Sequence, residues 1–65
     1  MPFIEMKTAK ATTEQKEKLV EGFTRIASET LGMPASAFYV LIEENEPENW
    51  GVGGKLLPKF MAEKE

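Results

Sequence analysis

Residues 11–32 read ATTEQKEKLVEGFTRIASETLG and decide the fold of this chain. Thr12, with Gln15 three positions later, fits the capping box that starts a helix. Apolar side chains then recur at helical spacing and form one stripe, made of Leu19, Val20, Phe23, Ile26, Ala27 and Leu31. Gly32, with a proline two positions later, is a typical signal for the end of a helix. The segment therefore predicts one helix of about five turns.

The segments on either side of this helix have the two-residue period of strands. FIEMKT (residues 3–8) stands before it and FYVLIEE (residues 38–44) stands after it. In the first segment one face has Ile4, Met6 and Thr8, and the other has Phe3, Glu5 and Lys7. In the second segment one face has Phe38, Val40 and Ile42, and the other has Tyr39, Leu41 and Glu43. A strand, a helix and a strand in one sheet imply parallel strands joined by a right-handed crossover. The sequence therefore predicts an α/β fold, a single β-α-β domain over residues 1–65.

The C-terminal part of the chain predicts a turn and an apolar surface. The acidic run EENEPEN (residues 43–49) is expected to be a solvated loop. The following stretch, WGVGG, has three glycines in four positions, which predict a tight turn or hairpin. The apolar residues that follow are not predicted to form a helix, and we expect them to pack against a neighbouring subunit. These residues are Leu56, Leu57, Phe60 and Met61.

The size of the chain also predicts assembly. A domain of 65 residues buries a modest fraction of its surface and is marginally stable alone. The chain has no cysteine for a disulfide and no histidine or cysteine to hold a structural zinc ion. Two strands and one helix leave a sheet edge open, which a second copy of the chain can extend. We therefore expect a homo-oligomer in which other copies complete the sheet.

Composition excludes several classes of function. The net charge is −3, and no cluster of lysine or arginine marks a nucleic-acid site. No stretch resembles a signal peptide or a membrane span, so we expect a cytoplasmic protein with no membrane partner. There is no histidine, no cysteine and no serine-nucleophile motif, and a turn explains GVGG as well as a phosphate loop does. The glutamates lack the spacing of a calcium site, so we expect neither a metal nor a cofactor.

The remaining candidate for chemistry is the amine of Pro2. Methionine ahead of proline is normally trimmed after synthesis, which would leave Pro2 with a free secondary amine. An α-amino group titrates at roughly 7.7 to 8.0, and an apolar pocket or a nearby cation lowers that pKa by disfavouring the charged form. Such an amine is a suitable general base near neutral pH. The alternative is structural, because proline is tolerated at the first residue of a strand, and with Met1 retained its nitrogen is an amide.

Four features together resemble the 4-oxalocrotonate tautomerase family over nearly the whole chain. They are Pro2 at the start of a strand, TEQK at residues 13–16, the strand FYVLIEE, and WGVGG at residues 50–54. The resemblance implies β-α-β subunits with a C-terminal hairpin that assemble as hexamers. It also implies that the amino-terminal proline acts as general base in a 1,3-keto–enol tautomerisation that needs no cofactor.

The resemblance also implies which residues form the site. Pro2 matches the family's catalytic base, and Trp50 falls where the family places an aromatic residue that lines the site. The family's arginine before the helix falls on Ala11, with Lys10 adjacent. Its second arginine falls on Tyr39, whose hydroxyl can donate one hydrogen bond to an enolate but brings no charge. The hypothesis is therefore that Pro2 and Tyr39 are catalytic and that Lys10 and Trp50 bind the substrate.

The expected substrate is a small 2-oxo or enol acid. Because both arginines are missing, a monocarboxylate such as an aryl enolpyruvate fits better than a dicarboxylate. Two alternatives stay open. One is a hydratase or dehalogenase of the same superfamily, for which Glu48 is an unaligned candidate carboxylate. The other is a non-catalytic binding or assembly subunit that has lost the substrate arginines.

Overall fold

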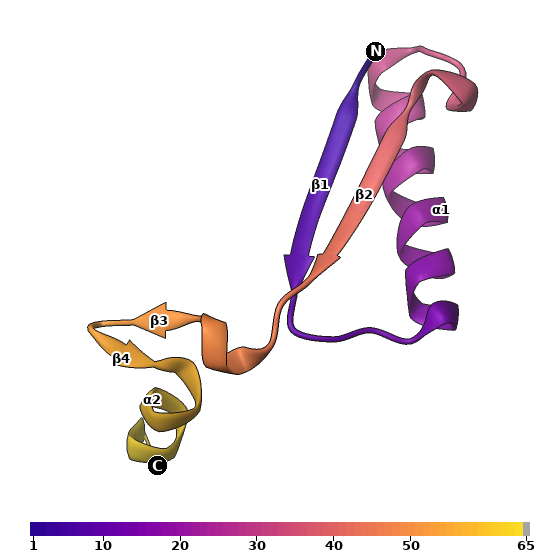
Figure 1. Cartoon of the computed structure of the whole chain (residues 1–65). Coiled ribbons are helices and arrows are strands. Elements are labelled where there is room, and N and C mark those ends of the chain that lie inside the picture. Colours follow the sequence, from indigo (N-terminus) through magenta and orange to yellow (C-terminus); the bar gives the residue numbers. More distant parts are fainter. Residues whose placement is uncertain (65) are drawn as a thin grey trace.

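The β-α-β unit forms the larger part of the structure, a computed structural model that describes residues 1–64 and the side chains of residues 1–62 (Figure 1). Residue 65, the last of the predicted domain, lies outside the described part. The helices and strands are β1 (Phe3–Thr8), α1 (Thr13–Leu31), β2 (Tyr39–Glu44), β3 (Gly51–Val52), β4 (Lys55–Leu56) and α2 (Leu57–Lys64). Short 3₁₀ turns at Ala35–Ala37 and Pro47–Asn49 precede β2 and β3.

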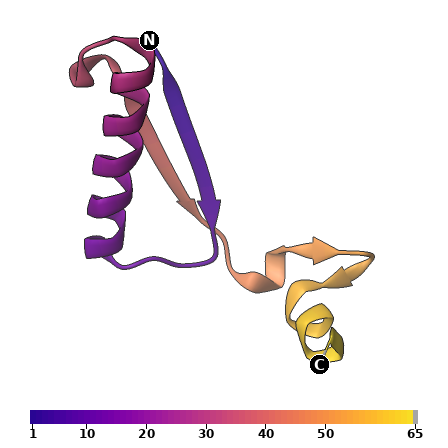
Figure 2. The ribbon, with the colours of Figure 1, turned by 180° about the vertical axis from the view of Figure 1, so that it is seen from behind.

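The sheet has the predicted parallel order. β1 pairs with β2 in a register that runs from Phe3 opposite Tyr39 to Thr8 opposite Glu44. α1 lies along one face of this pair, as two opposite views show (Figure 1, Figure 2). The helix-side residues of the two strands are half-buried, except the last residue, Glu44, and the residues of the other side are exposed, so the alternation read from the sequence is confirmed up to Ile42. The exposed face carries three large apolar residues, Phe3, Tyr39 and Leu41.

The predicted helix boundaries are also confirmed. The Thr12 hydroxyl accepts a hydrogen bond from the Gln15 backbone N–H at 3.1 Å, and the Gln15 side chain accepts one from the Thr12 N–H at 2.9 Å. These two bonds form the capping box. At the other end Gly32 has φ 69°, and its N–H donates to the carbonyl of Ser28 at 2.9 Å. Glycine adopts this left-handed conformation without the steric cost that a β-carbon brings.

Replacing Thr12 by alanine is expected to lower the stability of the fold by about 1 kcal/mol, because the N–H of Gln15 then loses its acceptor. The measurement is thermal denaturation at one fixed protein concentration, since assembly makes melting concentration-dependent. Thr13→Ala is the matched control, because Thr13 is the first helical residue and does not form the cap. Equal destabilisation by the two substitutions would contradict this assignment.

A single chain does not close a hydrophobic core. No described residue is buried, and two members of the predicted helix stripe, Ile26 and Leu31, are 58% and 57% exposed. The Cα radius of gyration is 15.6 Å, whereas a compact domain of this length has about 11 Å. The fold therefore leaves the apolar surfaces of the sheet and the helix uncovered within one chain. No helix within residues 1–64 combines the length and the apolar character needed to cross a lipid bilayer.

The C-terminal arm, residues 47–64, extends away from the β-α-β unit (Figure 2). Its glycines form the expected hairpin: β3 and β4 are antiparallel, and Gly53 and Gly54 between them have φ 59° and 85°. Positive φ at both positions is the mark of a tight two-residue hairpin loop. The arm exposes Leu56 and Met61, which are 55% and 53% exposed. It therefore carries apolar surface that its own chain leaves open.

Two details of the sequence interpretation of this region are wrong. The apolar residues after the hairpin do have a helix, α2, which packs mainly against the hairpin and the 3₁₀ turn before it. This helix was not predicted because it is short and contains Pro58, and proline usually interrupts a helix. Pro58 lies in the first turn, where proline is tolerated. The expected acidic loop over residues 43–49 also starts too early, because Glu43 and Glu44 belong to β2 and residues 47–49 form a 3₁₀ turn.

Candidate active site

Pro2 and Tyr39 lie at the same end of the sheet. The backbone N–H of Tyr39 donates to the carbonyl of Pro2 at 3.1 Å, at the point where β1 and β2 begin. Pro2 is half-buried, whereas Tyr39 shares the exposed face with Phe3 and is 55% exposed. The backbone therefore brings these two candidates together, and the Tyr39 side chain lies on the sheet face turned away from α1.

Lys10 and Trp50 lie at the opposite end. Lys10 follows β1, and the Trp50 ring N–H donates to the carbonyl of Asn45, just after β2, at 3.0 Å. The N–H of Asn45 in turn donates to the carbonyl of Thr8 at 2.9 Å. A strand of six residues spans about 20 Å. One chain therefore does not bring Pro2 close to Lys10 and Trp50. Glu48, the carboxylate of the hydratase alternative, is exposed in the 3₁₀ turn before Trp50.

Glu44 fixes the connection between β1 and α1. Its carboxylate accepts a hydrogen bond from the Ala11 N–H at 2.8 Å and contacts the Lys16 ammonium at 3.3 Å. The bond from Ala11 is the main reason that the pKa of Glu44 is lowered, and Lys16 and Lys10 lower it further. Ala11 is one of the positions where the resemblance implied an arginine. The role of Glu44 was not predicted, because its partner Ala11 is 33 residues away and the sequence does not give the strand register.

A hollow of about 370 Å³ lies between β1, this connection and α1. Its lining residues are Met6, Thr8, Lys10, Ala11, Gln15, Lys18 and Leu19. Apolar side chains and two lysines thus share one surface, which suits a carboxylate attached to an apolar group. Lys18, which lies 3.9 Å from Glu14, was not among the sequence-predicted residues. Lys18 lies one helical turn after Gln15, which lines the same hollow, and this spacing was the sequence signal that could have identified it.

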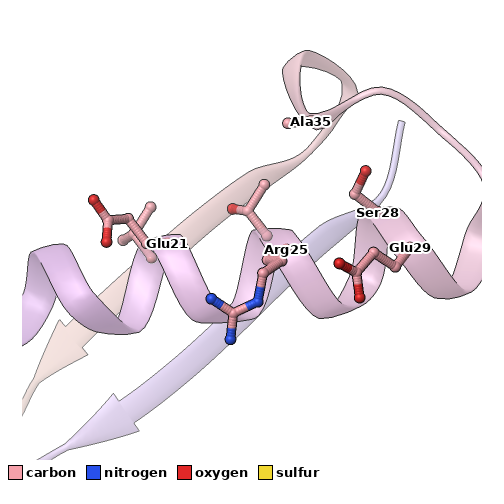
Figure 3. Close-up of a pocket in the computed structure, with 7 residues that line it drawn as sticks. Glu21, Arg25, Ser28, Glu29 and Ala35 are labelled. Atoms are coloured by element: carbon pink, nitrogen blue, oxygen red, sulfur yellow. The ribbon is translucent and has the colours of Figure 1, made fainter.

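A second hollow of about 540 Å³ runs along another side of α1. Figure 3 shows its labelled lining residues, Glu21, Arg25, Ser28 and Glu29 on the helix and Ala35 before β2. The Ser28 hydroxyl donates to the carbonyl of Met33. None of the sequence-predicted site residues lines this hollow. The chemistry-bearing residues therefore lie at the two ends of the sheet.

No metal site is formed by the part of the chain that the structure describes. No three described side chains of histidine, cysteine, aspartate or glutamate, all within residues 1–62, gather closely enough to hold a metal ion. The groups at the two ends of the sheet are instead Pro2 and the phenol of Tyr39 at one end, and the indole of Trp50 and the ammonium of Lys10 at the other. The phenol can donate a hydrogen bond, and the ammonium can hold an anion.

The chain is similar to known proteins over most of its length. A family model described as "Tautomerase enzyme" matches residues 2–59. The chain is 40% identical over 57 residues to "Probable tautomerase K2" of Dickeya dadantii, covering 85% of each chain. It is 38% identical over 58 residues to "2-hydroxymuconate tautomerase" of Bacillus subtilis, covering 88% of this chain and 94% of that one.

Solved structures have the same fold. TomN, described as a 4-oxalocrotonate tautomerase homologue in the tomaymycin biosynthetic pathway, superposes with a TM-score of 0.89 at 34% identity. The match covers 98% of this chain and 100% of TomN. YwhB, also described as a 4-oxalocrotonate tautomerase homologue, gives a TM-score of 0.82 at 36% identity, over 88% of this chain and 95% of that one. These similarities confirm the predicted β-α-β fold with a C-terminal hairpin.

Proposed function

Because the chain belongs to the tautomerase family of isomerases, we propose that it transfers a proton within a small 2-oxo or enol acid, with Pro2 as general base once Met1 is removed. The observation that carries this proposal is the position of Pro2. The family match starts at this residue, and its carbonyl bonds to β2 while its nitrogen has no part in the ladder. The nitrogen is therefore available for chemistry once it becomes an amine.

The proposed reaction needs no cofactor. For an enol acid, the lone pair of Pro2 takes the enol O–H proton, and the electron pair of the double bond becomes available at carbon. The protonated proline then returns the proton to that carbon, which gives the keto acid and restores the neutral amine. A hydroxyl donor such as that of Tyr39 would stabilise the negative oxygen of the enolate between the two transfers.

The proposed site is shared between copies of the chain. β1 pairs with β2 along one edge only, so its other edge is open in the single chain. A second copy lying antiparallel along that edge would bring its Pro2 to the end of β1 where Lys10 stands. Pro2 of one copy would then face the 370 Å³ hollow of the other. This arrangement supports a homo-oligomer, and the family resemblance supports a hexamer.

The lining of the hollow favours a monocarboxylate substrate. Lys10 and Lys18 offer positive charge, but a lysine does not form the two-pronged hydrogen bonds of an arginine with a carboxylate. Ala11 and Tyr39 occupy the two positions where the family has arginines. Met6 and Leu19 provide an apolar surface beside the lysines. An aryl enolpyruvate, with one carboxylate and one apolar ring, fits this lining.

The proposal is tested by the ketonisation of phenylenolpyruvate. We expect the intact mass of the natively expressed protein to lack Met1, and we expect its kcat/KM to exceed that of Pro2→Ala by about 10²-fold, within the range of general-base catalysis. Pro2→Ala keeps an amino-terminal amine but loses the secondary amine and the rigid ring. A wild-type protein that lacks Met1 and is no faster than Pro2→Ala would exclude this function for that substrate.

A further inference from the structure

Glu44 connects the sheet to the segment between β1 and α1, which includes Lys10 and Ala11. It is the last residue of β2, and it is paired with Thr8, the last residue of β1. One carboxylate oxygen accepts the Ala11 N–H at 2.8 Å, and the other contacts the Lys16 ammonium at 3.3 Å. One side chain therefore links the end of β2, the connection after β1 and the first turns of α1.

This link acts on the residue next to Lys10. Ala11 and Lys10 both line the 370 Å³ hollow, so the position of the Ala11 backbone sets where the Lys10 side chain starts. Glu44 also binds Lys16, a cation that does not line the hollow, whereas Lys10 and Lys18 do. The carboxylate thus fixes the connection through direct contacts with Ala11 and Lys16, and not with the two lysines that line the hollow.

The neighbouring residue extends the same link to the indole. Asn45 donates its N–H to the carbonyl of Thr8 at 2.9 Å, and its carbonyl accepts the Trp50 ring N–H at 3.0 Å. Residues 44 and 45 therefore hold the backbone of Ala11, the residue after Lys10, and the indole of Trp50 at the ends of the two strands.

We propose that Glu44 is a positioning residue of the active site, which holds Lys10 at the hollow so that it binds the carboxylate of the substrate. This inference rests on the proposed function. Because binding energy depends on placement, a small displacement of Lys10 weakens its interaction with the carboxylate and leaves the proton transfer at Pro2 unchanged. Loss of the Glu44 carboxylate should therefore raise KM for a charged substrate and leave kcat unchanged.

The test compares Glu44→Ala, Glu44→Gln and the matched control Glu43→Gln. Glu43 is the preceding residue of the same strand, lies on the exposed face, and contacts Lys7 at 3.7 Å. The substrates are phenylenolpyruvate and its uncharged methyl ester. We expect Glu44→Ala to raise KM for the acid about tenfold, with kcat and the KM of the ester unchanged. Glu44→Gln keeps an acceptor for the Ala11 N–H and should restore part of the loss, and Glu43→Gln should behave as wild type.

The contrary results are equally specific. Unchanged kinetics in Glu44→Ala, or a KM that rises equally for the acid and the ester, would overturn the positioning role. If the wild-type protein does not ketonise either substrate, the proposed function fails, and binding of 3-phenylpropanoate measured by calorimetry decides the inference. Weaker binding in Glu44→Ala but not in Glu43→Gln would then support it, and equal binding in all variants would overturn it.

Discussion

A chain with one additional alanine ahead of Pro2 is expected to lose kcat/KM for phenylenolpyruvate by about 10²-fold or more. The extra residue converts the proline nitrogen into an amide, which has no basic lone pair, while Pro2 itself remains in place. The amine that remains is displaced by about 3.8 Å, the length of one residue. Loss of the base and misplacement of the remaining amine therefore act together.

The measurement is the ketonisation rate of protein whose intact mass shows Met1 removed and the alanine retained. Pro2→Ala is the companion variant, because it keeps a terminal amine in the original position and should retain more activity than the extended chain. Both variants should elute from a size-exclusion column as wild type does. Full activity of the extended chain would show that the amine of Pro2 is not the base.

Replacing Leu41 by aspartate is expected to dissociate the assembly. Leu41 lies between Tyr39 and Glu43 on the exposed sheet face and is 47% exposed in the single chain, so a charge there would be tolerated by an isolated chain. If other copies cover this face, the charge must be buried without a partner, which costs several kcal/mol. Because no described residue is buried within one chain, dissociated chains should also lose their structure.

The mass in solution is measured by light scattering, and the helix content is measured by circular dichroism at the same concentration. Thr13→Asp is the control, because it introduces the same charge at an exposed residue in the first turn of α1, where a negative charge suits the helix dipole. It should leave mass and helix content unchanged. An unchanged mass for Leu41→Asp would show that this face is not part of an interface.

Local patterns of the sequence were sufficient to predict most of the fold. The helical spacing of residues 19–31, the capping pair Thr12 and Gln15, and the end signal at Gly32 all act over a few residues, and the structure has each of them. The alternation of side chains between the two faces of a strand, in residues 3–8 and 38–44, can also be read from neighbouring residues alone. The helix α2 was missed because its sequence is short and contains Pro58, and short helices depend on tertiary contacts.

The candidate site was less accessible to such reasoning. Pro2 was predicted from the chemistry of a proline that directly follows a methionine, which is a pattern of two adjacent residues. Glu44 was not found because its hydrogen bond to Ala11 exists only in one particular register of β1 against β2. The separation of Pro2 from Lys10 along β1 was not evident either. A list of four candidate residues does not show that they lie at two ends of a sheet, or that different copies would have to supply them.

The length of β1, which separates Pro2 from Lys10, has a genetic consequence. If each active centre combines the amine of one copy with the lysine of another, two alleles that are each defective can complement one another. A mixed assembly of Pro2→Ala chains and Lys10-deficient chains would contain some centres in which both groups are intact. The same two lesions placed together in one polypeptide would leave no intact centre at all.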